Sequence, residues 1–337
     1  MHGGIYVTIM VTGGAGYIGS HTVAELLEHG EEVVVIDNLG LGHEEAVRAL
    51  NVPFYHFDIR DRDALVHVMR SHTIESVVHF AAYSQVGESV RVPLTYYQNN
   101  VAGTAELLAA MVEAGVMRIV FSSTAATYGE PEAIPIGENH PKRPTNPYGE
   151  TKLAIERMLY WCYSAYGMQS ISLRYFNAAG AHPTLPIGEH HMHETHLIPL
   201  LLQTALGVRS HFTVFGNDYP TADGSCIRDY IHVMDLASAH RLALKRLRHR
   251  VVGAEAFNLG IGTGYSVFDV IHAARAVTKR EIHYLVGERR SGDPAVLVAS
   301  SDLAKVALKW EPKYQDLASI IESAWNWHLH HPDGFRD

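Results

Sequence analysis

The chain has 337 residues and a mass of 37.3 kDa, with 47% hydrophobic and 19% charged residues, so it suggests one large domain or two unequal ones. Its formal net charge of −9 argues against a nucleic-acid binder, and no apolar run approaches the roughly 18 residues of a membrane span. Two cysteines, Cys162 and Cys226, are too few for a disulfide scaffold and fit a reducing cytoplasm. Residues 1–10 have no cationic stretch before their apolar residues, so we expect no signal peptide.

The first half alternates apolar runs with helical patterns. Residues 6–12 are a short apolar run that ends in glycines, residues 17–29 have apolar residues at helical spacing, and residues 32–37 contain four consecutive β-branched residues. Further strands are expected at 54–57, 76–81, 118–122 and 170–175, and helices at 100–114 and 147–166. Continuous apolar strands between helices predict an α/β protein with a doubly wound parallel sheet, covered on both faces.

After about residue 177 this alternation stops. Prolines, glycines and histidines gather in residues 183–196, and helices are expected near 197–206, 235–247 and 316–330. This part predicts a smaller, mixed C-terminal domain.

A glycine motif follows the first expected strand and opens the first helix. Gly13, Gly16 and Gly19 have the spacing GxxGxxG, which allows a tight turn and a close approach of the backbone to a diphosphate at a helix N-terminus. A merely structural glycine turn is the alternative. Asp37 ends the second expected strand, where a carboxylate would accept from ribose hydroxyls and repel a 2′-phosphate, so we expect NAD rather than NADP. Asp58 ends the third strand and would either approach the adenine amine or cap the next helix.

Residues 146–152 predict a helix that begins with catalytic side chains. Asn146 is a good N-cap and Pro147 a good first helical residue, so Tyr148 and Lys152 lie one turn apart on one face. A phenol has a pKa near 10, and an ammonium and a positive nicotinamide would both lower it. Thr124 follows the fifth strand and could share a proton with the same substrate oxygen. The alternative is a surface tyrosine beside a solvated lysine.

With these motifs, the chain resembles the extended short-chain dehydrogenase/reductase family, and in particular its nucleotide-sugar 4-epimerases. The matching stretches are GGAGYIGSH at 13–21, YGETK at 148–152, LRYFNAAGAHP at 173–183, FGNDYPTADGSCIRDYIHVMDLA at 215–237 and RRSGDP at 289–294. The resemblance implies a Rossmann-type NAD-binding domain at 1–176, with a later contribution from about 228–258, and a UDP-sugar-binding domain at 177–337. It further implies interconversion of UDP-galactose and UDP-glucose by C4 oxidation, rotation of the 4-keto intermediate and re-reduction.

The resemblance also assigns residues to each part of the site. Catalysis falls to Thr124, Tyr148 and Lys152. The cofactor is expected at Gly13, Gly16, Tyr17, Ile18, Gly19, Asp37, Asn38, Asp58, Ile59, Phe80, Ala81, Ala82, Asn99, Ser122, Tyr148, Lys152 and Tyr175. The UDP-sugar is expected at Thr124, Tyr148, Asn177, His196, Leu197, Phe215, Arg228, Arg290, Asp293 and Leu297. Arginine supplies the planar, permanently charged forks that suit a diphosphate. A homodimer built on the helices after Asn99 and Tyr148 is also implied.

The sequence departs from the family pattern at three positions. Ser84 stands where many members carry a lysine near the cofactor phosphates, and His196 where some carry an asparagine. Leu297 occupies a pocket-wall position that is aromatic in some members and small in others.

A histidine-rich segment from His190 to His196 holds four imidazoles in seven residues. A zinc site needs three or four ligands on a preorganised frame, and the motif HExxH is absent, so we expect a flexible, solvated loop and no metal.

Two other functions compete with an epimerase. A dehydratase of this family carries an acidic pair directly after the threonine, whereas this chain has Ala125 and Ala126 there, and alanine cannot transfer a proton. A decarboxylase of the same fold stays open. A non-catalytic dinucleotide sensor would not need Tyr148 and Lys152 together.

Overall fold

The computed structural model describes residues 8–290 and 293–335 and divides them into two compact units. The first unit comprises residues up to 129, 142–174 and 237–257, and the second comprises 130–141, 175–236 and the rest of the chain from 258. The predicted strand at 6–12 is therefore described from Thr8 onward, and residues 291 and 292 of the RRSGDP stretch also lie outside the described residues. Among the described residues, no helix combines the length and the hydropathy needed to cross a bilayer.

A seven-stranded sheet forms the centre of the first unit, in the order β10-β6-β5-β4-β1-β2-β3. β1 pairs in parallel with β2 and β4, β2 with β3, and β4 with β5. Because the strand order reverses direction between β1 and β4, a ligand crevice is expected at their carboxyl ends. This architecture confirms the predicted doubly wound α/β fold.

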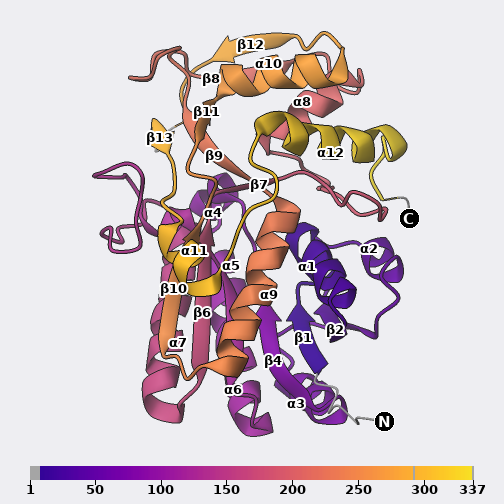
Figure 1. Cartoon of the computed structure of the whole chain (residues 1–337), viewed down its shortest axis with the longest axis vertical. Coiled ribbons are helices and arrows are strands. Elements are labelled where there is room, and N and C mark those ends of the chain that lie inside the picture. The colour runs from indigo at the N-terminus through magenta and orange to yellow at the C-terminus, as the bar shows by residue number, and fades with distance from the viewer. Residues whose placement is uncertain (1–7, 291–292, 336–337) are drawn as a thin grey trace. The chain divides into compact units, whose positions relative to one another are not determined.

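The elements along this sheet agree closely with the sequence prediction from β1 to β6, and Figure 1 labels β1, β2, β4, β6 and β10 among them. The strands are β1 (Thr8–Thr12), β2 (Glu32–Asp37), β3 (Phe54–His56), β4 (Ile74–His79), β5 (Arg118–Thr124), β6 (Gln169–Tyr175) and β10 (Ala254–Leu259). The helices are α1 (Tyr17–Glu28), α2 (Glu44–Arg48), α3 (Arg62–Ser71), α4 (Val86–Arg91), α5 (Pro93–Tyr96), the π-helix η1 (Tyr97–Ala102), α6 (Gly103–Ala114), the 3₁₀ turn η2 (Ala125–Thr127), α7 (Pro147–Tyr166) and α9 (Val233–His249).

Apolar side chains from both strands and helices fill the interior of this unit. Met10 and Val34 on the strands pack with Leu107 of α6 and Ile155 of α7 in one buried cluster. This packing removes the helix faces and both strand faces from water, which is the main source of stability for such a sheet.

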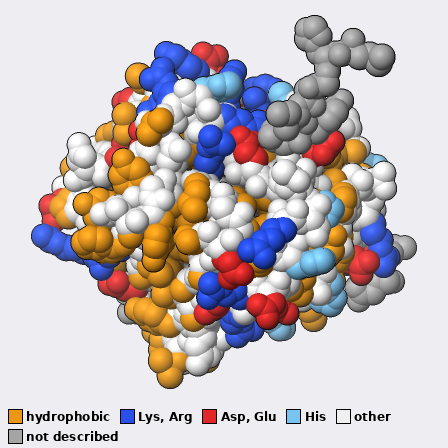
Figure 2. Space-filling model, turned by 90° about the horizontal axis from the view of Figure 1, so that it is seen from below, with side chains coloured by type: hydrophobic (Ala, Val, Ile, Leu, Met, Phe, Trp, Pro, Cys, Tyr) orange, Lys and Arg blue, Asp and Glu red, His pale blue; other side chains and the backbone are white. Residues whose placement is uncertain are grey.

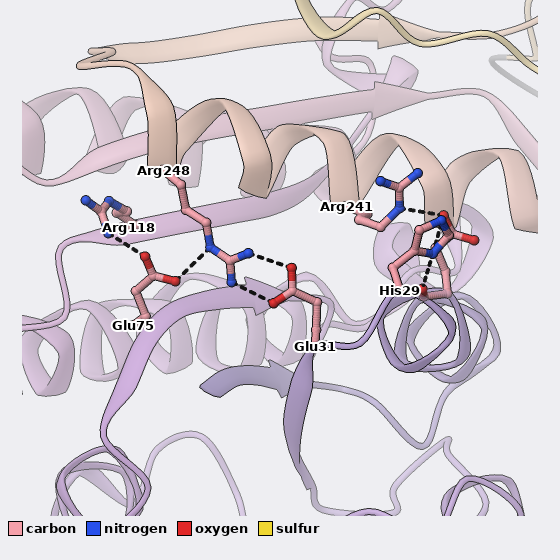
Figure 3. A network of polar contacts seen from close by, with 7 residues as sticks. His29, Glu31, Glu75, Arg118, Arg241 and Arg248 are labelled. Carbon is pink, nitrogen blue, oxygen red and sulfur yellow. Dashed lines mark hydrogen bonds and ion pairs between the residues drawn. The ribbon is translucent and has the colours of Figure 1, made fainter. Parts of the chain in front are cut away.

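Arg248, near the end of α9, connects that helix to β4 and to the residue before β2 (Figure 3). Its guanidinium donates to Glu31, just before β2, at 2.5 and 2.9 Å, and to Glu75 of β4 at 2.8 Å. Glu75 also accepts from Arg118 at 2.8 Å, and Arg241 of α9 donates to Glu25 of α1 at 2.7 Å. Residues 237–257 therefore complete the first unit although they come late in the chain.

The second unit is built on two small sheets and a separate core. One sheet has the order β11-β9-β13 with β7 also paired to β9, and the other pairs β12 with β8. The strands are β7 (Asn177–Ala179), β8 (Phe212–Phe215), β9 (Ile227–His232), β11 (Gly264–Ser266), β12 (Tyr284–Gly287) and β13 (Val296–Leu297), and the helices are α8 (Leu197–Ala205), α10 (Val267–Thr278), α11 (Asp302–Leu308) and α12 (Leu317–His330). Leu201, Val270 and Ile320 belong to its buried core.

Candidate active site

The glycine motif forms a tight cradle at the start of α1. Gly13 has a φ of +75°, and a Cβ there would lie 2.5 Å from the backbone nitrogen of Ala81. A Cβ on Gly19 would lie 2.1 Å from the carbonyl oxygen of Gly13. Gly16 is the N-cap of α1, which has no side-chain cap and no acidic residue in its first turn. The N–H groups of this helix end, which has no capping side chain, fit the diphosphate of a dinucleotide.

Asp37 is the last residue of β2, as predicted, and its carboxylate is fixed by the backbone. Oδ2 accepts from the amide of Ala15 at 3.0 Å and Oδ1 from the amide of Leu39 at 2.8 Å. Burial raises the pKa of Asp37, and the two amide hydrogen bonds oppose that rise. The carboxylate retains further lone pairs, so it fits a ribose diol.

Asp58 does not cap the next helix, and that alternative is wrong. The N-cap of α3 is Asp61, which accepts from the amide of Ala64. Asp58 instead accepts from Arg60 at 2.7 and 2.9 Å and from Asn38 at 2.9 Å. The hydrogen bonds from Arg60 are the main reason that the pKa of Asp58 falls to about 2.

Three predicted catalytic side chains meet where β5 ends and α7 begins. Asn146 caps α7 by accepting from the amide of Gly149, and this sets Tyr148 in the first turn. Tyr148 and Thr124 are joined by a hydrogen bond that favours the phenolate. Lys152 is 2% exposed, and its Nζ donates to the carbonyl oxygen of Ser122 at 2.8 Å and lies 5.9 Å from the centre of the Tyr148 ring.

Burial is the main influence on the pKa values of Lys152 and Tyr148. It lowers the pKa of Lys152 to about 7 and raises the pKa of Tyr148 to about 12, although the hydrogen bond from Thr124 opposes that rise. Lys152 was expected to lower the pKa of Tyr148, but within the chain alone desolvation outweighs any such effect. The phenolate therefore needs a further positive charge when it acts as a base.

A neutral histidine lies near these side chains, and sequence reasoning missed it. His79 ends β4, and its ring nitrogens contact Thr12 of β1 at 2.7 Å and Thr104 of α6 at 2.9 Å. Burial, followed by the nearby charge of Lys152, lowers its pKa to about 3. His79 thus links two strands and a helix through hydrogen bonds alone.

A buried ion pair one turn along α7 was also missed. Arg174 donates to Glu156 at 2.8 and 2.6 Å and to the hydroxyl of Tyr128 at 2.9 Å. Ser123, the neighbour of Thr124, donates to the same carboxylate at 2.6 Å. The pair therefore fixes β5 beside α7. The i, i+4 spacing of Lys152 and Glu156 was the available signal, but their partners lie far away in sequence.

The predicted helix at 100–114 begins as a π-helix, η1, before it becomes α6. π-helical turns are rare and often mark functional sites. Here the turn directs Asn100 toward Tyr83, whose amide and carbonyl both bond to its side chain at 2.8 and 3.0 Å. Asn99, the predicted cofactor residue, donates to Asn100 at 3.0 Å.

The remaining predicted cofactor residues lie at loop or element ends. Phe80 packs against His240, with ring centres 4.7 Å apart, and Ser122 contributes its carbonyl to Lys152. The others are Tyr17 and Ile18 at the start of α1, Ile59 after β3, Ala81 and Ala82 after β4, and Tyr175 at the end of β6.

In the second unit, the predicted arginines are held by different partners. Arg228 on β9 is 8% exposed and forms an ion pair with Asp293, while Leu297 of β13 lies beside it in register. The guanidinium of Arg290 lies 4.1 Å from the centre of the Phe215 ring. Phe215 and Arg290 line a hollow of about 520 Å³ with Glu194 and neighbouring residues of α8 and β8. An aromatic face and a fixed cation suit a base and a phosphate.

The histidine-rich segment is a loop with exposed residues, among them Met192, His193 and His196, as predicted, but two carboxylates in and beside it are buried. The side chains of Glu189 and Glu194 are only 5% and 3% exposed, and they face His191 and His196. Burial would lower the pKa of His196, but the carboxylates of Glu189 and Glu194 raise it to about 10. His196 is the N-cap of α8 and precedes Leu197, whereas Asn177 lies on β7.

This fold and these side chains define the class of doubly wound, dinucleotide-binding α/β proteins. Residues 9–260 match the family described as the NAD dependent epimerase/dehydratase family, and the chain belongs to it. The resemblance drawn from the motifs is thereby confirmed.

Individual relatives cover nearly the whole chain. It is 59% identical to a UDP-glucose 4-epimerase of Halalkalibacterium halodurans, over 98% of both chains. A crystal structure of a UDP-glucose 4-epimerase matches with a TM-score of 0.95 and 52% identity, over 98% of this chain and 100% of the other. The Bifidobacterium longum enzyme in complex with NAD⁺ and UDP matches with a TM-score of 0.93 and 37% identity, over 98% and 100%.

Proposed function

We propose that the chain interconverts UDP-galactose and UDP-glucose with bound NAD, by oxidising C4, rotating the 4-keto sugar and reducing it from the other face. The single observation that carries this proposal is the hydrogen bond between Thr124 and Tyr148, with the buried Lys152 beside them. The full-length similarity to UDP-glucose 4-epimerases supports it.

Each catalytic side chain has a separate task. Tyr148 takes the proton from O4 of the sugar and later returns it, and Thr124 hydrogen-bonds the same oxygen. Lys152 holds the nicotinamide ribose and contributes positive charge near Tyr148. When bound, NAD⁺ accepts the C4 hydride and gives it back, so no net oxidation occurs. Its positive ring is also the extra charge that the phenolate of Tyr148 needs.

The glycine cradle and Asp37 serve the two ends of the NAD adenosine diphosphate. The N-terminus of α1 faces the diphosphate, and Asp37 accepts from the ribose hydroxyls. Because a carboxylate there repels a 2′-phosphate, NAD is preferred to NADP.

The second unit holds the nucleotide of the sugar. Arg228 and Arg290 bind the diphosphate as planar forks, and Phe215 lies against the base. Asn177, His196, Leu197, Asp293 and Leu297 complete this set. Few charges are left for the sugar ring, which permits it to rotate.

Elimination of water is disfavoured by the residues after Thr124. Ala125 and Ala126 form the turn η2, and neither side chain can give or take a proton. This separates the proposed epimerase from a 4,6-dehydratase.

We further propose a homodimer in the cytoplasm, with residues 1–176 and about 228–258 binding NAD and residues 177–337 binding the UDP-sugar. Figure 2 shows hydrophobic side chains gathered in the left half of one face. In the first unit, exposed apolar side chains occur on α4, α5 and η1, all of which pack against α7: Val90, Leu94 and Tyr97. On α7 itself Trp161 is 67% exposed.

A coupled assay tests the function. Purified chain is supplied with UDP-galactose and no added NAD, and UDP-glucose is scored. We expect turnover without accumulation of free NADH, and release of NAD(H) when the protein is denatured. Full activity only with added NADP would contradict the role of Asp37, and steady formation of NADH would identify a dehydrogenase.

A further inference from the structure

Four side chains of the loop before α8 point to a metal site in the second unit. Glu189, His191, Glu194 and His196 each offer a ligand atom, and these four atoms all lie within 4.8 Å of one another. They come from a single eight-residue segment, so they belong to one unit of the structure.

The carboxylates are buried and positioned before any ion arrives. The side chains of Glu189 and Glu194 are 5% and 3% exposed, and those of His191 and His196 are 21% and 47% exposed. The amides of Thr195 and His196 both donate to Oε1 of Glu194 at 2.7 Å. The side with His196 remains open to solvent, which gives an ion an entry path.

Hydrogen bonds from the two imidazoles alone account poorly for these distances to the two carboxylates. Nδ1 of His196 lies 2.9 Å from Glu189 and 3.0 Å from Glu194, while Nδ1 of His191 lies 3.6 and 3.2 Å from the same two carboxylates. Each Nδ1 carries at most one hydrogen, so it can only share that hydrogen between the two carboxylates. Two buried carboxylates so close together need positive charge between them, and a metal ion supplies it as a protonated imidazole does.

A tetrahedral metal ion fits the same spacings. Zinc binds imidazole nitrogen and carboxylate oxygen at about 2.0–2.2 Å, which separates neighbouring ligand atoms by about 3.3–3.6 Å. With Oε1 of Glu189 and Oε2 of Glu194 as the carboxylate ligand atoms, three nitrogen–oxygen distances are 2.9, 3.2 and 3.6 Å and lie near that range. The other oxygen of Glu194, Oε1, lies 3.0 Å from Nδ1 of His196. Imidazole favours zinc over magnesium or calcium, which prefer six or more oxygen ligands.

We propose that Glu189, His191, Glu194 and His196 bind one Zn²⁺ ion per chain. The four protein ligands close the coordination shell, so the ion is structural and does no chemistry on a substrate. It connects the segment at 189–196 to the N-terminus of α8. Since Glu194 also lines the hollow that contains Phe215 and Arg290, the ion stabilises one wall of that hollow.

The test uses the untagged full-length chain, treated with a chelator and desalted. The protein is titrated with zinc chloride in a calorimeter, and its zinc content is measured by mass spectrometry after a second desalting. We expect one tightly held zinc per chain. Titration with Co²⁺ should give the intense visible absorption of a tetrahedral site.

Two variants and one control identify the ligands. His191→Ala and Glu194→Gln should each weaken zinc binding by more than about 100-fold, because loss of even an outer partner of a metal ligand costs about 10–100-fold. Glu194→Gln keeps an oxygen for the amides of Thr195 and His196, so the loop can retain its fold. His193→Ala, an exposed histidine of the same loop, should bind zinc normally.

Other outcomes would overturn the proposal. If the unmodified chain binds less than one zinc ion per chain, these four side chains form only a cluster of hydrogen-bonded ion pairs and not a metal site. Equal weakening by His193→Ala would mean that zinc binds diffusely to the many histidines. A six-coordinate cobalt spectrum would contradict the four-ligand site. Circular dichroism of each variant separates loss of ligands from loss of fold.

Discussion

Two buried cations, Lys152 of α7 and Arg174 of β6, have opposite kinds of partner. Glu156, which pairs with Arg174, lies one turn along α7 from Lys152. Lys152 and Arg174 are 2% and 3% exposed. Arg174 forms an ion pair with Glu156, which helps to raise its pKa against the effect of burial. Lys152 has a carbonyl oxygen as its hydrogen-bond partner, and burial lowers its pKa to about 7.

This difference separates a structural charge from a reactive group. A paired buried charge keeps its proton at every physiological pH and fixes the elements that it joins. An unpaired buried cation such as Lys152 has a pKa near 7, so its charge changes with whatever binds next to it. Tyr148 and Lys152, whose protonation can change, therefore lie at the start of α7. Glu156, whose ion pair with Arg174 fixes the local structure, lies one turn further along the helix.

The largest expected effect is a loss of turnover when Tyr148, at the start of α7, is replaced. Tyr148→Phe should keep cofactor and UDP-sugar binding but lose about 10²–10⁴-fold in turnover, because only the proton acceptor is removed. The measurement is kcat for UDP-galactose, with binding checked by calorimetry. Tyr160→Phe, an exposed tyrosine on the same helix, is the control. Near-normal turnover of Tyr148→Phe would show that another group is the base.

On the structural side, Glu156→Gln should cost about 3–5 kcal/mol of folding stability, because it leaves Arg174 buried and unpaired. Denaturant unfolding measures the loss. Replacing both partners by apolar residues, Glu156→Leu with Arg174→Met, should cost less than Glu156→Gln alone. Glu322→Gln, at an exposed position, should change stability little. If the double variant is the least stable, the pair contributes net stability and the contrast with Lys152 weakens.

In the second unit, we expect the volume of the side chain at position 297, rather than charge, to decide which UDP-sugars are accepted. Leucine at 297 is intermediate in size, so we expect strong activity on UDP-galactose and weak activity on its N-acetylated form. Leu297→Tyr should abolish the weak activity and Leu297→Ser should raise it, since overfilling a packed site costs about 1–3 kcal/mol. The ratio of kcat/KM for the two sugars measures this. Equal effects on both sugars would place Leu297 away from C2 of the sugar.

The smallest expected effect is a pH dependence of stability due to Lys152. The folded pKa of about 7 lies below the ordinary value of 10.5, so its contribution is fully present above pH 10.5 and is lost as the pH falls toward 7. Lys152→Met lacks this loss. The Tm of Lys152→Met minus that of the unmodified chain should therefore increase by a few degrees between pH 10 and pH 7. Lys245→Met, on the surface of α9, should give no such trend.

Much of this arrangement could be predicted because it depends on short-range patterns. Gly13, Gly16 and Gly19 lie within seven residues of sequence, and Tyr148 and Lys152 are four residues apart on one helix. The spacing of apolar residues placed the first six strands of the large sheet to within about two residues, and the doubly wound fold was confirmed.

The missed features all depend on partners that are distant in sequence or on unusual backbone. The carboxylate of Glu156 meets Arg174 only after α7 packs on β6. The π-helix η1 has no composition that distinguishes it from the α-helix expected there. Glu189 was not grouped with the histidines because nothing in its local pattern indicates burial. The functional roles of the site residues remain predictions.

The position of Arg248 has a consequence for synthesis of the chain. Glu31 is made 217 residues before the arginine that neutralises it. At about 5–20 residues per second, a ribosome needs about 10–45 s to cover that interval. Through this time the edge of β6 has no β10 beside it, and Glu31 lacks the guanidinium of Arg248, whereas Glu75 already has that of Arg118. The first unit can reach its final form only after translation has passed residue 257, so the edge of its sheet at β6 is paired late in synthesis.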